Sequence, residues 1–178
     1  MNDLTTWTGQ ALAFIETHQA WAAPIVFLLA FGESLAFVSL LLPATFLLVG
    51  IGAIVGAGNI SFSGIWFAAA LGAGLGDWLS YWLGYHYADQ IARMWPLSKY
   101  PDLMPRAHEA FEKWGALAVF FGRFFGPLRA GVPLAAGAAR MDQTPFQIAN
   151  WLSAPVWATG LLAPGAFGAE WLTRWFSG

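Results

Sequence analysis

Two arginines and two prolines interrupt an apolar stretch, and this combination constrains the fold more than any other feature of the chain. Residues 120–137 read FFGRFFGPLRAGVPLAAG and contain Arg123, Arg129, Pro127 and Pro133. The two prolines are predicted to break a helix in this stretch. An arginine in the hydrocarbon of a membrane costs ~2.5–3.5 kcal/mol on insertion scales and more in simulations. Two such residues therefore need either acidic partners inside the protein or an anionic ligand.

The composition places this stretch in a membrane. The chain is 58% hydrophobic and only 10% charged, whereas soluble domains carry about 25% charged residues. We therefore expect an all-α, multi-pass protein of the cell (inner or plasma) membrane, with the lipid bilayer as its surroundings. The absence of Cys excludes disulfides, thiolate metal sites and Cys nucleophiles. The net charge of -2 gives no reason to expect a nucleic-acid partner.

Residues 21–58 form an apolar segment of unusual length. The segment is too long for one span of ~20 residues and short for two spans with a turn. Pro43 removes a backbone donor and breaks a helix, and four glycines follow it. The sequence favours a broken, re-entrant hairpin, which protein or a watery cavity must cover at membrane depth. Two ordinary spans are the alternative.

Residues 61–84 predict a spanning helix with a ridge of small side chains. Small residues recur at every fourth position, at Ala68, Gly72, Gly76, Ser80 and Gly84. Such a ridge lets another helix approach closely in lipid, either within the chain or in a homo-oligomer. Asp77 and Tyr81 lie beside the ridge, so Asp77 is predicted to point into the protein.

The remaining segments are predicted to be interfacial or spanning. Residues 4–19 have the helical spacing of an interfacial helix. Residues 85–115 are expected to form a surface loop that contains a short interfacial helix starting near Asp102. Residues 146–168 predict a second spanning helix, bent at its two prolines.

The two interrupted segments share one pattern. Phe31-Gly32-Glu33 is followed after nine residues by Pro43, and Phe121-Gly122-Arg123 is followed after nine residues by Pro133. Chance similarity in an apolar chain is the alternative to a true repeat. A true repeat, with one crossing between its halves, gives the inverted layout of secondary transporters.

This pattern predicts one membrane domain over residues 1–178. Repeat 1 covers about 21–84, an interfacial loop covers 85–115, and repeat 2 covers about 116–170.

The motifs in this order resemble the DedA family of membrane proteins (the SNARE-associated or VTT-domain group). The resemblance covers residues 25 to 170 and rests on R-F-x-G-P-x-R followed by P-x-x-A-G, on an upstream G-E with a later Pro, and on G-D-x-x-x-Y-x-x-G. The residues concerned are Glu33, Pro43, Gly76, Asp77, Tyr81, Gly84, Arg123, Phe124, Pro127, Arg129, Pro133, Ala136 and Gly137.

The resemblance implies two facing re-entrant hairpins and a transporter, or flippase, for undecaprenyl phosphate or another phospholipid. It assigns the important acid to Glu33 and the substrate-binding arginines to Arg123 and Arg129. Many members carry a second acid two residues after the first hairpin's proline, where this chain has Thr45. Whether Asp77 replaces that acid in proton coupling stays open.

Two functions fit the four ionisable groups at predicted membrane depth. The charges of Glu33, Asp77, Arg123 and Arg129 cancel, as expected of a purely structural ion-pair network or an assembly partner. In the transport hypothesis, protonation of Glu33 releases the arginines, which bind phosphate bidentately.

An enzyme is not expected, and no catalytic residue, cofactor or metal ligand is assigned. Residues 74–77 spell the G-x-G-D of intramembrane aspartyl proteases, but the second Tyr-Asp motif needed to pair two carboxylates is absent. The three histidines, His18, His86 and His108, lack metal-ligand spacing.

Overall fold

The computed structural model describes residues 19–35, 38–39, 44–57, 60–93, 103–125 and 129–176. Within these ranges the chain forms seven helices and no strand, which confirms the all-α class. The helices are α2 (Gln19–Ser34), α3 (Ala44–Ala57), α4 (Phe62–Arg93), α5 (Leu103–Trp114), α6 (Ala116–Gly122), α7 (Gly131–Ala138) and α8 (Gln143–Phe176).

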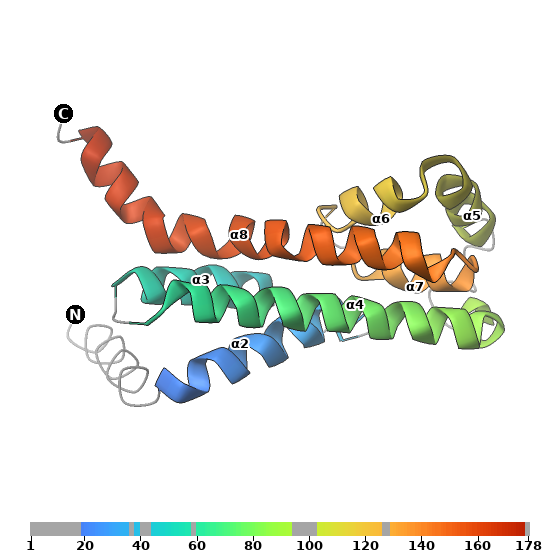
Figure 1. The fold of residues 1–178 in the computed structure, drawn as a ribbon, viewed down its shortest axis with the longest axis horizontal. Helices are drawn as coiled ribbons and strands as arrows, with labels where there is room; N and C mark the ends of the chain where they lie inside the picture. Colours follow the sequence, from blue (N-terminus) through green and yellow to red (C-terminus); the bar gives the residue numbers. More distant parts are fainter. Residues whose placement is uncertain are drawn as a thin grey trace.

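The two longest helices form the frame of the molecule. α4 and α8 run antiparallel along the long axis, with α2 and α3 beside one half of this pair (Figure 1). α6 and α7 lie beside the other half, and α5 lies at that end (Figure 1). The breaks between α2 and α3 and between α6 and α7 both lie near the middle of the frame.

Each pair of short helices is divided between the two long ones. α2 packs mainly on α4, whereas α3 packs mainly on α8. In the second half the partners are exchanged, because α6 packs on α8 and α7 packs on α4. This exchange is the contact pattern expected when two similar halves are related by a two-fold axis.

The predicted break in residues 21–58 is confirmed, and Pro43 lies outside the described residues. In the second segment α6 ends at Gly122 and α7 begins at Gly131, while Pro127 also lies outside the described residues. The prediction that Pro133 breaks a helix is wrong. Pro133 is the third residue of α7, where the backbone N–H has no partner within the helix, so a proline costs nothing there.

The ridge of small residues on α4 packs inside the chain. A Cβ atom at Gly72 would collide with the carbonyl of Phe27, and one at Gly76 with the carbonyl of Phe31, both on α2. Further along, Gly84 lies against the carbonyl of Leu134 on α7. One ridge therefore serves both halves of the molecule.

Helix α4 is longer than predicted. It continues from the expected end near Gly84 to Arg93, with a kink at Tyr87 (φ -119°, ψ 27°). The prediction of a loop from residue 85 is therefore wrong for residues 85–93. No glycine or proline follows Gly84 before Pro96, so the change from apolar to polar residues does not by itself end the helix.

The short helix expected near Asp102 is confirmed as α5. Its polar residues Arg106, Glu109, Glu112 and Lys113 are exposed, and Phe111 on the other face is half-buried. The interfacial helix predicted for residues 4–19 falls on residues that the structure does not describe, apart from Gln19 at the start of α2.

Helix α8 contains both predicted prolines, Pro155 and Pro164. Its C-terminal part bends away from α4 (Figure 1), and Pro164 precedes that part. A proline within a helix removes one backbone hydrogen bond and kinks the axis.

Among the described residues, no helix has both the length and the apolar character that crossing a membrane requires. The helices predicted over 61–84 and 146–168 are present within α4 and α8, and their crossing of a membrane is not confirmed.

The buried apolar residues form two clusters. The first cluster joins α2, α3, α4 and α8 and includes Val26, Leu48 and Leu162. The second joins α4, α6, α7 and α8 and includes Tyr81 and Phe146. Between these clusters the buried side chains of both long helices are polar, and they belong to the site: Asp77 and Ser80 on α4, and Asn150 and Ser153 on α8.

Candidate functional site: a buried layer of paired charges

A layer of buried polar side chains separates the two apolar clusters. On α4 the first cluster ends at Ala73 and the second begins at Tyr81, with Asp77 between them. On α8 the equivalent position between the clusters holds Asn150 and Ser153. Both arginines of the second half enter this layer.

Arg129 connects the two halves of the molecule. Its Nη1 donates to Oε1 of Glu33 at 2.8 Å, and its Nη2 donates to the hydroxyl of Ser34 at 3.0 Å. The guanidinium carbon also lies 4.2 Å from the ring centroid of Trp157 on α8. Glu33 is 4% exposed and Arg129 8%, so this pair is shielded from solvent.

Arg123 follows α6 directly and joins α4 to α8. Its Nη2 donates to Oδ2 of Asp77 and, at 2.7 Å, to Oδ1 of Asn150. The amide nitrogen of Asn150 donates to the carbonyl of Gly74 at 2.9 Å, which fixes the orientation of the amide. Arg123 Nη1 is buried and has no hydrogen-bond partner in the part of the chain that the structure describes.

A further hydrogen bond fastens α2 to α4 beside this layer. The hydroxyl of Ser80 donates to the carbonyl of Ser34 at 3.0 Å. The carbonyl would otherwise lack a partner, because it lies at the end of α2. Ser80, one of the small residues of the ridge, thus links α4 to the end of α2 at one side of the polar layer.

The layer is balanced in charge but sensitive to any single change. Two arginines face two carboxylates, and all four side chains are buried. Removing one partner of a buried pair leaves an uncompensated charge, which costs 3–5 kcal/mol in typical cases. Replacing both partners by neutral groups is often close to neutral for stability.

The structure brings together the four ionisable residues singled out from the sequence, with a pairing that the repeat did not predict. Glu33 and Arg123 occupy equivalent positions in the two motifs, yet Glu33 pairs with Arg129 and Arg123 pairs with Asp77. Asn150 and Trp157 were not predicted from the sequence to belong to the site. An uncharged amide in an apolar helix is a signal that could have identified Asn150.

The remaining motif residues build the second apolar cluster and its packing. The hydroxyl of Tyr81 donates to the carbonyl of Met141 at 2.5 Å, and its ring stacks on Phe146 with centroids 4.2 Å apart. Gly137 on α7 contacts the carbonyl of Tyr81. The backbone of Thr45 lies in α3, and the position of its side chain is not described.

Similar proteins have been found in bacteria. The VTT domain model matches residues 42–167. Inner membrane protein YabI of Escherichia coli is 35% identical over 152 residues, which is 85% of this chain and 60% of YabI. Inner membrane protein YqjA of the same organism is 31% identical over 146 residues, covering 79% of this chain and 64% of YqjA. An uncharacterized membrane protein of Buchnera aphidicola is 29% identical over 153 residues.

The chain thus spans about 60% of the length of the relatives that it matches. No solved structure matches it. The family model covers most of the chain, and the relatives are named as inner membrane proteins. The chain therefore belongs to the VTT-domain (DedA) family and is a protein of the inner membrane.

Proposed function

We propose that the chain moves a lipid phosphate across the inner membrane, with undecaprenyl phosphate or another phospholipid as the substrate. Arg123 and Arg129 bind the phosphate, and Glu33 and Asp77 hold the arginines when the substrate is absent. One observation carries the proposal. Arg123 Nη1 is a buried donor without a hydrogen-bond partner among the described residues, whereas a network selected only for structure satisfies its buried donors.

The binding step is an exchange of anions at the arginines. Two oxygens of a phosphate can accept from one guanidinium in the bidentate manner of a carboxylate, so a phosphate can replace Glu33 or Asp77 at either arginine. A carboxyl group displaced into a buried site takes up a proton more readily than one in water. Substrate binding is thereby linked to proton uptake, which couples transport to the proton gradient.

The arrangement of helices supports alternating access to such a site. The break of each short helix pair lies near the middle of the α4–α8 frame (Figure 1), and the paired charges lie between the two clusters there. We infer that α2–α3 and α6–α7 are re-entrant hairpins that enter from opposite faces of the membrane. This is the inverted-repeat layout in which substrate sites lie near the midplane.

The structural alternative is favoured by one observation, the direct pairing of each arginine with a carboxylate. In this alternative the charges hold the halves together, for folding or for assembly with a partner. The two functions differ in what happens when a whole pair is neutralised, because a purely structural pair can be replaced without loss of activity.

Ligand binding is tested first by thermal stability. We expect purified protein to gain thermal stability with undecaprenyl phosphate and not with undecaprenol, which has the same chain and no phosphate. A ligand at a hundred times its Kd stabilises by about 2.7 kcal/mol. Equal stabilisation by both lipids would argue against a phosphate site.

Transport is tested in proteoliposomes with the double variant Glu33→Gln, Arg129→Gln. We expect this variant to keep a melting temperature close to that of the unmodified chain and to lose translocation of the carrier lipid. The single variant Arg129→Lys keeps the charge but loses the bidentate fork, and it should be impaired as well. Full translocation of the carrier lipid by the double variant would contradict the role of the Glu33–Arg129 pair in transport and would favour the structural alternative.

A further inference from the structure

An apolar groove lies on the exposed side of α4, outside the buried layer of paired charges. It has a volume of about 420 Å³ and is lined by Phe31, Leu75, Trp78, Leu79 and Trp82. Two of these side chains, Trp78 and Trp82, are each 42% exposed. The volume falls in the ~300–1,000 Å³ range of small-molecule sites.

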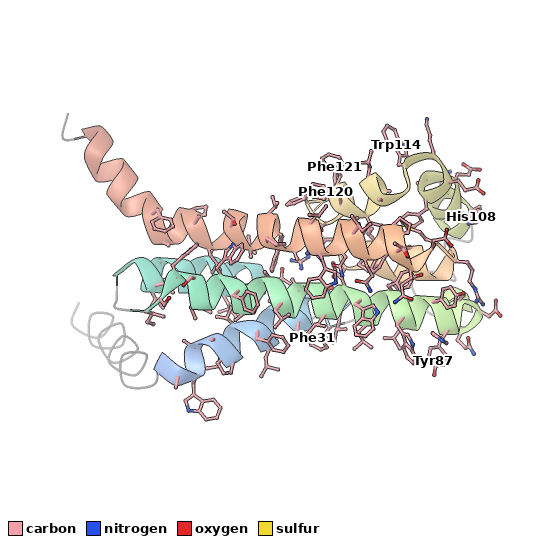
Figure 2. All side chains as sticks on the ribbon, in the orientation of Figure 1. Phe31, Tyr87, His108, Trp114, Phe120 and Phe121 are labelled. Carbon is pink, nitrogen blue, oxygen red and sulfur yellow. The ribbon has the colours of Figure 1, made fainter. Side chains whose placement is uncertain are left out.

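A second cavity continues the groove toward the C-terminal end of α4. It has a volume of about 230 Å³, and it shares Trp78 and Trp82 with the apolar groove. Its lining also includes Arg140, Asp142 and His86. The two cavities adjoin at Trp78 and Trp82, with the apolar lining on one side and Arg140 and Asp142 on the other. Phe31 on α2 marks the apolar side, and Tyr87 lies further along, on α4 (Figure 2).

Arg140 is held in place at the charged end. It has a positive φ of 57°, which is uncommon for a residue other than glycine, and its guanidinium lies 4.6 Å above the ring of Tyr85. No ion pair to Arg140 occurs among the described residues. Its charge is therefore available to a ligand anion.

His86 is also fixed. Its Nδ1 lies 2.9 Å from the carbonyl of Trp82, and its ring lies 4.5 Å from that of Trp82. Because a carbonyl only accepts hydrogen bonds, Nδ1 carries the proton. The histidine thus helps to shape the wall. The cavity is also lined by the guanidinium of Arg140 and the carboxylate of Asp142.

We propose that this composite groove binds a zwitterionic phospholipid with a primary ammonium group. The phosphate pairs with Arg140, the ammonium pairs with Asp142, and an acyl chain lies along Trp78 and Leu79. The occupant follows from charge complementarity and from the position of the groove, since tryptophan and tyrosine concentrate where membrane proteins meet the lipid headgroups.

This site is separate from the proposed transport site. Arg123 and Arg129 are buried between the apolar clusters, whereas the groove is open at the surface of α4. The inference depends on the inner-membrane location and not on transport. The variants that test the groove are therefore placed at Arg140 and Asp142, and Arg123 and Arg129 are left unchanged.

The experiment compares three lipids with identical acyl chains on the purified full chain, by native mass spectrometry after delipidation. The probes are phosphatidylethanolamine, phosphatidylglycerol and diacylglycerol. We expect the unmodified chain to retain phosphatidylethanolamine best and diacylglycerol least. Arg140→Asn should lower retention of phosphatidylethanolamine by about tenfold or more, as expected for loss of one charged hydrogen-bonding group. Asparagine tolerates a positive φ, so the backbone is preserved.

Two further variants decide the outcome. Asp142→Asn should shift the preference toward phosphatidylglycerol, because the anion that selects the ammonium is gone. Arg106→Gln removes an exposed arginine on α5, outside the groove, and should bind like the unmodified chain. Equal losses in Arg140→Asn and Arg106→Gln would overturn the proposal, and so would stronger retention of phosphatidylglycerol than of phosphatidylethanolamine by the unmodified chain.

Discussion

At the scale of single residues, Asn150 is the side chain that organises the charged layer. It accepts from Arg123 at 2.7 Å and donates to the carbonyl of Gly74 at 2.9 Å. A carboxylate could accept from the arginine but could not donate to the carbonyl, and an alcohol would be too short to do both. The amide is therefore matched to its two neighbours.

We expect Asn150→Ala to lower the free energy of unfolding by about 1–3 kcal/mol, because it leaves buried polar groups without partners. The control is Ser153→Ala on the same helix. Ser153 is also buried, but within the described ranges its hydroxyl bonds only to the backbone carbonyl of Asn150, so a smaller loss is expected. Denaturant unfolding in detergent measures both values, and equal losses would contradict the role given to Asn150.

The presence of the charged layer could be predicted from sequence, but its pairing could not. The cost of a charge in hydrocarbon requires Arg123 and Arg129 to have partners, and only a few acids lie in apolar segments. Whether Arg123 pairs with Glu33 or with Asp77 depends on the distance in space between the end of α6 and α4. The spacing of residues along the chain does not determine that distance. Trp157 was missed because an aromatic residue in an apolar helix gives no sign that it stacks on a cation.

At the scale of helices, α4 is the element on which both halves pack. Its glycines contact the backbone of α2 at one end and that of α7 at the other. Close approach of this kind needs the absence of a side chain, since backbone atoms of the neighbouring helix cannot move aside. The regular spacing of these glycines predicted close helix packing, but it left open whether the packing partner lay in the same chain or in a second copy.

We expect Gly84→Ala to destabilise the protein by about 1–3 kcal/mol, because a Cβ atom there overlaps the backbone of α7. The matched control is Gly64→Ala in the same helix, where no atom lies within 4 Å of the new Cβ. That substitution should be neutral or stabilising by up to ~1 kcal/mol, since alanine favours helix more than glycine does. Melting temperatures of the two variants provide the comparison.

Helix limits were predicted less well than helix packing. The sequence placed the end of α4 at Gly84 because polar residues begin there, and Pro133 was expected to break a helix. Both errors have one cause. A change in polarity or a proline indicates a boundary, but the helix ends only where hydrogen bonding fails, and neither Tyr85 nor the first turn of α7 meets that condition.

At the scale of the whole molecule, the two short helix pairs lie at opposite ends of the α4–α8 frame. If the hairpins enter from opposite faces, the connection before α4 and the helix α5 must lie on opposite sides of the membrane. The chain contains no Cys, so single Cys variants can report on each side without further changes.

We expect Ser61→Cys and Lys113→Cys to react with a membrane-impermeant thiol reagent from opposite sides. Both side chains are exposed. Labelling intact cells and inverted vesicles separates the two faces, and detergent-solubilised protein shows the full extent of reaction. Labelling of both variants from one face would contradict the inverted arrangement.

The exchange of partners between the halves also sets the order in which a nascent chain can complete its structure. α2 meets its partner α4 soon after synthesis, but α3 packs mainly on α8, which is made last. Domains form as the chain emerges, N-terminal parts first. Until residues 143–176 have been synthesised, α3 lacks its main docking surface, so the first half of the protein depends on the second to finish folding.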